Sequence, residues 1–312
     1  MKSSAIEVSG LRKAFGDKVV LDGIDFEVAA GSVFSMLGPN GAGKTTTVNV
    51  LATLLKGDSG TVRVAGHDVA TETKAVRAAI GVTGQFAAVD ELLSGRENLE
   101  LMADLKRVRS KEQLVSGLLE RFDLTESADK RSATYSGGMR RKLDLAMTLV
   151  GTPRIIFLDE PTTGLDPRSR RTMWGIVREL VAEGTTIFLT TQYLEEADQL
   201  ADRLVVLDQG KLVAEGTPDE LKRQAPGTHV RLRFTDIADL EVADRILPGG
   251  ARDDEELTLR VPSDGQSRSL RALLDRLDEY MINAEEFAVH TPDLDDVFLA
   301  LTGRTSAEAI AK

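Results

Sequence analysis

A glycine-rich run near the N-terminus carries the chemistry of a phosphate-binding loop. It reads Gly38-Pro39-Asn40-Gly41-Ala42-Gly43-Lys44-Thr45, with Thr46 next, and follows the apolar run 33–37. It fits the pattern G-x-x-x-x-G-K-[ST] between a strand and a helix. The backbone N–H groups would converge on the phosphates, Lys44 would add a cation, and the Thr45 hydroxyl could bind Mg²⁺. The alternative, a glycine turn that only starts a helix, explains less of the pattern.

An acidic pair forms the second candidate element. The apolar run 155–158 ends in Asp159 and Glu160. Asp159 suits a magnesium site, and Glu160 suits a general base for an attacking water. Acidic pairs after apolar strands are common by chance, so this interpretation depends on the phosphate loop that precedes it.

A second glycine run predicts a further anion site. It reads Tyr135-Ser136-Gly137-Gly138-Met139 and precedes a helix-like stretch at 140–149. Ser136 and the N–H groups of Gly137 and Gly138 would meet a phosphate at a helix N-terminus. One chain then has two phosphate-binding surfaces, and only one belongs with its own Lys44. The other predicts a second copy of the chain.

This second run resembles the signature of ABC ATPases, usually Leu-Ser-Gly-Gly-Gln, with Tyr135 and Met139 differing at its ends. The resemblance covers about residues 6 to 220. It implies that Phe15 stacks on adenine, that Gln85 contacts magnesium and the attacking water, and that Asp166, in Gly164-Leu165-Asp166, belongs to the nucleotide site at the dimer interface. Taken singly, these residues would be a core aromatic, a surface glutamine and a helix start.

Gln192 departs from the family pattern. The family usually has a histidine here that contacts the γ-phosphate, whereas this chain has histidines only at 67, 229 and 290. A glutamine amide can donate a hydrogen bond to a phosphate, but it carries no charge. We therefore expect hydrolysis with Glu160, Gln192 and Gln85 as the catalytic group. A weakly hydrolysing, ATP-gated regulatory module is one alternative.

The apolar patterns predict an α/β fold that positions these elements. Strands are expected near 24–28, 33–37, 61–65, 80–83, 155–159, 186–190 and 204–207. Helix-like stretches at 97–105, 112–122 and 139–149 predict a helical subdomain at about 90–150. The resemblance implies a P-loop ABC nucleotide-binding domain with a mixed sheet core and an antiparallel β part.

A small α+β domain is expected after this cassette. Thr217-Pro218-Asp219-Glu220 predicts a helix start, and Pro226-Gly227 ends that helix. We therefore expect an ATPase domain at 1–225 and an accessory domain at 226–312. The accessory domain should contain strands at 230–234, 257–261 and 286–289, a helix at 270–277, and a last helix with Leu294, Val297, Phe298 and Leu301 at helical spacing.

Composition narrows the function classes. The 312 residues are 42% apolar and 29% charged, carry a net charge of −11 and include no cysteine. No apolar run reaches the roughly 18 residues of a membrane span, and the N-terminus does not resemble a signal peptide, so the cytosol is expected. The sequence contains no run of basic residues of the kind that binds nucleic acid, so no nucleic acid partner is expected. This acidic balance, with one cassette, argues against the other alternative, a soluble ABC ATPase that acts on DNA or ribosomes.

Three features resemble daunorubicin/doxorubicin-resistance-type export ATPases: Gln192, the run 84–90 and the acidic-aromatic tail 291–299. The apolar positions of the tail are also explained by ordinary core packing. The resemblance implies an ATP-hydrolysing subunit that powers efflux of drug-like or antibiotic compounds through a separate integral membrane permease. It further implies ATP and Mg²⁺ as cofactors, a head-to-tail homodimer at the cytoplasmic face of the membrane, and a permease contact at about 85–105.

Overall fold

The computed structural model describes residues 3–302 apart from 86, 224–226, 265 and 291. They form two compact units, the first ending at Pro218 and the second beginning at Asp219. The domain boundary predicted between residues 225 and 226 lies outside the described residues. None of the described helices combines the length and apolar character needed to cross a bilayer.

Two sheets form the first unit. The antiparallel sheet has the strand order β2-β1-β4-β5, with bounds β1 (Ser4–Phe15), β2 (Lys18–Ala29), β4 (Ser59–Val64) and β5 (His67–Asp68). The mixed sheet has the order β10-β9-β3-β8-β7-β6, with bounds β3 (Val33–Leu37), β6 (Ile80–Thr83), β7 (Ile155–Asp159), β8 (Thr186–Thr191), β9 (Arg203–Asp208) and β10 (Lys211–Gly216). The strands predicted for this unit are confirmed, while β1, β5 and β10 were not predicted.

The parallel core of the mixed sheet brings the chemical elements to one edge. Strands β3, β7 and β8 are buried along their whole length, as their apolar runs predict. In their parallel register Leu37 pairs with Thr191, and Asp159 pairs with Thr190. Ligand sites in such sheets lie beyond the carboxyl ends of the strands. The phosphate loop, the acidic pair and Gln192 all follow these ends.

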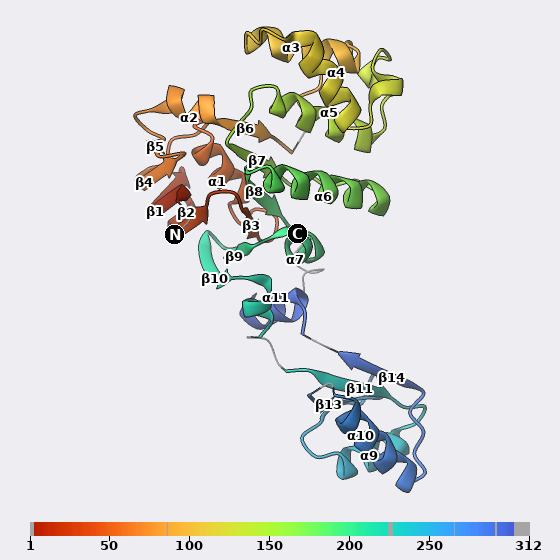
Figure 1. Cartoon of the computed structure of the whole chain (residues 1–312). Coiled ribbons are helices and arrows are strands. Elements are labelled where there is room, and N and C mark those ends of the chain that lie inside the picture. The colour runs from red at the N-terminus through yellow and green to blue at the C-terminus, as the bar shows by residue number, and fades with distance from the viewer. Residues whose placement is uncertain (1–2, 86, 224–226, 265, 291, 303–312) are drawn as a thin grey trace. The chain divides into compact units, whose positions relative to one another are not determined.

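Helices cover the mixed sheet and build a separate helical group. Their bounds are α1 (Lys44–Leu51), α2 (Thr73–Ala79), α3 (Gly95–Leu105), α4 (Lys111–Arg121), α5 (Gly137–Leu149), α6 (Pro167–Ala182) and α7 (Leu194–Leu200). Helix α8 (Pro218–Lys222) begins at the last residue of the first unit and belongs otherwise to the second. Helices α3, α4 and α5 gather at one end of the unit (Figure 1), where the helical subdomain was predicted. One apolar core joins these helices to α6 and to the mixed sheet, and a second joins the two sheets through the stacked rings of Phe26, Phe34 and Phe188.

The second unit is a four-stranded antiparallel sheet of order β12-β13-β11-β14 with helices. Its elements are β11 (His229–Arg233), α9 (Ile237–Ile246), β12 (Ala251–Asp253), β13 (Thr258–Pro262), α10 (Ser267–Glu279), β14 (Glu286–His290) and α11 (Leu294–Thr302). Without α11 this is the βαββαβ arrangement of ferredoxin-like folds.

Two elements of the second unit, α9 and β12, were not predicted from the sequence. Asp236 caps α9 by accepting a hydrogen bond from the Asp239 N–H at 2.9 Å, and Leu240, Ala243 and Ile246 form its buried face. In α11, Leu294, Val297 and Phe298 are buried as the spacing predicts, but Leu301 is 39% exposed.

Candidate active site

The phosphate loop runs from the end of β3 to the start of α1 and admits little besides glycine at three positions. Gly41 and Gly43 have φ values of +77° and +115°. A Cβ on Gly38 would lie 2.3 Å from the Leu207 carbonyl oxygen, and one on Gly43 would lie 2.7 Å from Leu21 Cδ2. Among the described residues no side chain caps α1. Its first N–H groups are therefore suited to an anion.

Lys44 is buried beside the loop that it follows. Its Nζ donates hydrogen bonds to the carbonyl oxygens of Gly38 at 2.7 Å and Pro39 at 3.1 Å, and it lies 3.1 Å from Glu160 Oε1. Burial lowers the pKa of the Lys44 ammonium, although the Glu160 carboxylate acts to raise it. The structure thus brings together the predicted phosphate-binding cation and the predicted general base.

The acidic pair is fixed by the neighbouring strand. Thr190 donates its hydroxyl to Asp159 Oδ1, and the Thr190 carbonyl accepts the Glu160 N–H at 3.1 Å. Glu160 has a φ of +48°, in the left-handed region that non-glycine residues rarely adopt. Such strain costs of order 1 kcal/mol and is concentrated at functional sites. This turn directs the Glu160 carboxylate toward Lys44, while Thr163 Oγ1 donates to its other oxygen at 3.3 Å.

Gln192, Gln85 and Phe15 are three further residues of the predicted site. Gln192 follows β8, and its Oε1 is buried without a hydrogen-bond partner among the described residues. Gln85 is exposed after β6. Phe15 ends β1 and is 51% exposed, with Lys13 Nζ 5.4 Å from the centre of its ring. Phe15 is therefore not a core residue, and its ring is accessible for stacking.

The signature run caps α5. Ser136 Oγ accepts the Met139 N–H at 3.2 Å, and Ser136 and Gly137 are exposed at the start of the helix. Tyr135, which stands where the family usually has leucine, is buried, and its hydroxyl donates to the Ser127 carbonyl at 2.6 Å. Burial raises the pKa of the Tyr135 phenol. None of the hydrogen bonds or ion pairs between described residues joins this run to the phosphate loop.

Asp166 is the N-cap of α6. Its carboxylate accepts the N–H groups of Arg168 and Ser169, both at 2.9 Å, and the Ser169 hydroxyl at 2.6 Å. These hydrogen bonds, that of the Ser169 hydroxyl first, lower the Asp166 pKa. Asp166 therefore caps the helix that the sequence predicts to start at this residue. Contact with a nucleotide across a dimer stays a prediction.

Three buried charged residues near the site were missed by the sequence reasoning. Arg141 and Asp144 lie on the otherwise apolar face of α5, and Glu196 lies on α7. Glu196 Oε1 accepts hydrogen bonds from Thr162 Oγ1 at 2.8 Å and Trp174 Nε1 at 3.0 Å. The signal that could have found them is a charge that falls in the apolar stripe of a predicted helix, because buried charges need partners.

The predicted magnesium ligands are Thr45, Asp159 and Gln85. Hydroxyl, carboxylate and amide oxygens are hard donors of the kind that Mg²⁺ prefers. Thr45 is exposed at the start of α1, and Asp159 is held by Thr190 at the adjoining strand end. The donor set therefore fits this ion in chemistry.

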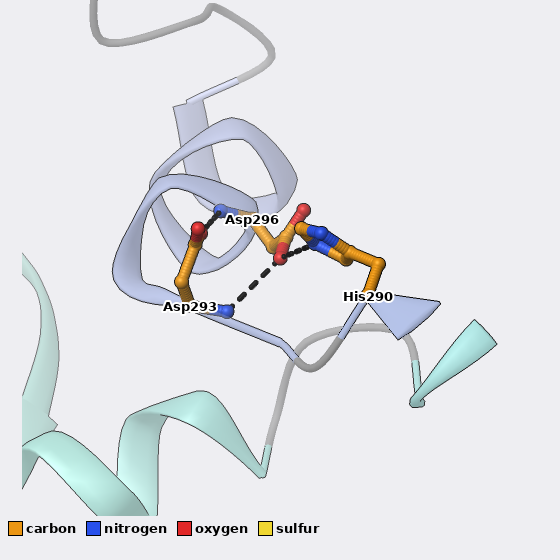
Figure 2. A group of neighbouring side chains, drawn as sticks. All are labelled: His290, Asp293 and Asp296. Carbon is orange, nitrogen blue, oxygen red and sulfur yellow. Dashed lines mark hydrogen bonds and ion pairs between the residues drawn. The ribbon is translucent and has the colours of Figure 1, made fainter. Parts of the chain in front are cut away.

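A separate group of possible metal ligands lies in the second unit (Figure 2). His290 Nε2 is 2.7 Å from Asp296 Oδ2. Asp296 and Asp293 also accept each other's N–H groups, both at 3.0 Å, at the start of α11. This reciprocal capping satisfies the start of α11. We therefore assign the group a structural role.

Comparison with known proteins connects this site with transport. A family model described as ABC transporter matches residues 21–163. The chain is 50% identical over 307 residues to daunorubicin resistance ATP-binding protein DrrA3 of Streptomyces coeruleorubidus, covering 97% of each chain. It is 44% identical to doxorubicin resistance ATP-binding protein DrrA of Mycobacterium tuberculosis, covering 96% of this chain and 93% of the relative. A Nod factor export ATP-binding protein I of Rhizobium sp. is 37% identical, with 97% and 99% covered.

Solved structures share the fold of the first unit. The ADP conformation of an ATP-binding cassette of an ABC transporter superposes with a TM-score of 0.64 at 27% identity, covering 70% of this chain and 93% of that one. A nucleotide-free ATP-binding cassette gives the same TM-score and identity, with 71% and 94% covered.

Proposed function

Because the chain belongs to the ABC transporter ATP-binding proteins, among those of the daunorubicin/doxorubicin-resistance type, we propose that two copies of it hydrolyse ATP to drive export of drug-like or antibiotic compounds through a separate membrane permease. The observation that carries this proposal is the contact of Lys44 with Glu160 at the phosphate loop. It joins a phosphate-binding cation to a carboxylate able to accept a proton.

Hydrolysis follows from the groups around this contact. The γ-phosphate of ATP would compete with Glu160 for the Lys44 ammonium, and the N–H groups at the start of α1 would bind the same phosphate group. Glu160, no longer neutralised by Lys44, can then accept the proton of the attacking water. Bound Mg²⁺, held by Thr45, Asp159 and Gln85, would neutralise charge that develops on the phosphates.

The dimer follows from the second anion site. Ser136 caps the exposed start of α5 and would contact the γ-phosphate bound at the partner's Lys44 loop, with Asp166 at the same interface. Two ATP molecules would then be enclosed between two identical chains, so that nucleotide favours closure and hydrolysis allows reopening.

We assign the permease contact to the segment 85–105. Leu92, Leu101 and Leu105 are 78%, 45% and 69% exposed there, so apolar side chains are accessible for such a contact. Such a contact would hold the chain at the cytoplasmic face of the membrane, where ATP is available. Residues 226–312 are proposed as an accessory domain of this subunit.

Single-turnover ATP hydrolysis by the purified chain tests the proposal, with Glu160→Gln as the matched control. We expect hydrolysis by the wild type, little by the variant, and stimulation when the chain is reconstituted with its permease and exported compounds. Because Gln192 lacks the charge of a histidine, the alternative outcome is a module that binds ATP without turnover. A wild type no faster than Glu160→Gln, even with the permease, supports that alternative.

A further inference from the structure

Two charged side chains of α5 lie one helical turn apart inside the first unit. Arg141 is 7% exposed and Asp144 is 3% exposed, with 3.5 Å between Arg141 Nη1 and Asp144 Oδ2. Burial lowers the pKa of the Arg141 guanidinium and raises the pKa of the Asp144 carboxyl. Burying two charges is unfavourable unless hydrogen bonds compensate for the lost water. The partners of this pair are therefore informative.

Arg141 binds three backbone carbonyls that flank the predicted catalytic residues. Nη1 donates to the Gly84 carbonyl at 2.7 Å, directly before Gln85. Nη2 donates to the Asp159 carbonyl at 3.1 Å and Nε to the Pro161 carbonyl at 2.9 Å, on the two sides of Glu160. A planar guanidinium can bridge several acceptors in this way, whereas a lysine ammonium is a single point charge.

Asp144 holds the other side of the Gln85 segment. Its Oδ1 accepts the Ala88 N–H at 2.9 Å. Arg141 and Asp144 together therefore fix Gly84 and Ala88, on either side of Gln85, to the same face of α5. Gln85 itself is exposed and can meet a ligand while its segment is held.

The N-cap of the same helix is Ser136, five residues before Arg141. In the proposed dimer this end of α5 contacts ATP bound to the partner copy. A helix is stiff over such a distance, so a shift at Ser136 reaches Arg141 and Asp144. From there it reaches the segments of Gln85 and Glu160, which serve the ATP site of the same chain.

We propose that Arg141 and Asp144 are positioning residues that couple the signature helix to Gln85 and Glu160, so that hydrolysis at one ATP site depends on closure at the other. The proposal rests on the proposed dimer. The proposal predicts cooperative ATP hydrolysis by the dimer. Each α5 would contact the ATP bound to the partner copy and would also position Gln85 and Glu160 at the ATP site of its own chain.

Steady-state ATP hydrolysis by full-length Arg141→Lys tests the coupling. The variant keeps the positive charge beside Asp144 but cannot bridge three carbonyls. We expect kcat to fall by about tenfold or more, the Hill coefficient to fall from above 1 to 1, and the Kd for ATP to stay within about twofold. Lys142→Ala is the control, because Lys142 lies on the same helix and its one ion pair among the described residues is with the exposed Asp123 at 3.5 Å. It should leave all three quantities unchanged.

The melting temperature of Arg141→Lys shows whether this variant folds. If it does not fold, Asp144→Asn is the second variant. Asp144→Asn keeps an acceptor for the Ala88 N–H but removes the charge opposite Arg141, so the same pattern is expected with a smaller fall in kcat. A folded variant with wild-type kcat and Hill coefficient overturns the coupling. A wild type that hydrolyses ATP without cooperativity also overturns the coupling. A variant whose fall in kcat is accompanied by weaker ATP binding and a lower melting temperature overturns it as well, because general destabilisation would then explain the loss. A wild type without any hydrolysis instead overturns the proposed function.

Discussion

Lys44 Nζ lies 3.1 Å from Glu160 Oε1, so the cation of the phosphate loop and the predicted general base neutralise each other. Both side chains are more than nine-tenths buried, which strengthens their attraction. A phosphate that binds Lys44 must compete with this carboxylate. Substrate binding and activation of the base are thereby linked in one contact.

The first prediction concerns Glu160→Gln. The amide can still hydrogen-bond to Lys44, but it cannot accept the proton of the attacking water. Turnover should fall by about 100-fold to 10,000-fold, the range that a general base contributes. ATP binding should persist, and size-exclusion chromatography with ATP should show an accumulated dimer.

Lys44→Ala is the comparison for that experiment. It removes the phosphate-binding cation and leaves Glu160 buried without its partner, so ATP binding itself should be lost. If Glu160→Gln retained turnover within about twofold of the wild type, Glu160 would not be the general base.

The second prediction concerns the close contact of α5 with α6. A Cβ on Gly138 would lie 2.8 Å from Ser169 Oγ and 3.2 Å from Ser169 Cβ. Gly138→Ala should therefore lower the free energy of unfolding by roughly 1–3 kcal/mol, measured by urea denaturation, and weaken the ATP-dependent dimer. Gly137→Ala is the matched control, because its Cβ would meet only Leu165 Cδ2 at 3.8 Å. Equal stability losses in the two variants would contradict the steric explanation.

Much of the first unit could be predicted because its chemistry lies in contiguous residues. The phosphate loop, the acidic pair and the signature run each combine a strand or helix end with the groups that act there. Runs such as 33–37 and 155–158 are mainly apolar because both faces of their strands are buried. Placing these strands side by side then brings their ends together.

Contacts between distant segments could not be predicted in the same way. The Arg141 guanidinium reaches Gly84 and Pro161, which are far apart in the sequence, and no local pattern marks a carbonyl as its acceptor. The approach of Glu160 to Lys44 depends on the left-handed backbone conformation of Glu160, which a glutamate rarely adopts. Helix α9, whose buried residues are Leu240, Ala243 and Ile246, was also missed.

The third prediction is a pH-dependent stability that originates at Glu196. Burial raises the pKa of this carboxyl, although hydrogen bonds from Thr162 and Trp174 act to lower it. The folded state therefore keeps a proton that the unfolded state releases as the pH rises above the ordinary glutamate value. The contribution of Glu196 to stability is highest below that value and declines as the pH rises toward the folded pKa.

Glu196→Gln isolates this contribution, because its amide oxygen can still accept from Thr162 and Trp174. Urea denaturation at pH 5 and pH 8 should show the variant gaining stability relative to the wild type at the higher pH. Glu195→Gln removes the same charge from an exposed neighbour on the same helix and should show a constant difference. If the difference in the free energy of unfolding between Glu196→Gln and the wild type were the same at both pH values, the prediction would be contradicted.

The fourth prediction concerns Gln192, at the position where related cassettes usually carry histidine. Its Oε1 is buried without a hydrogen-bond partner among the described residues, so the amide is not committed to a structural contact through that atom. Gln192→His would supply a group that can bear charge beside the γ-phosphate. We expect turnover to be retained or increased, with ATP affinity unchanged, in single-turnover and steady-state assays. Gln192→Ala is the control, and it should lower turnover because it removes the hydrogen-bond donor. A Gln192→His variant that binds ATP normally but no longer hydrolyses it would show that this residue does not occupy the γ-phosphate position.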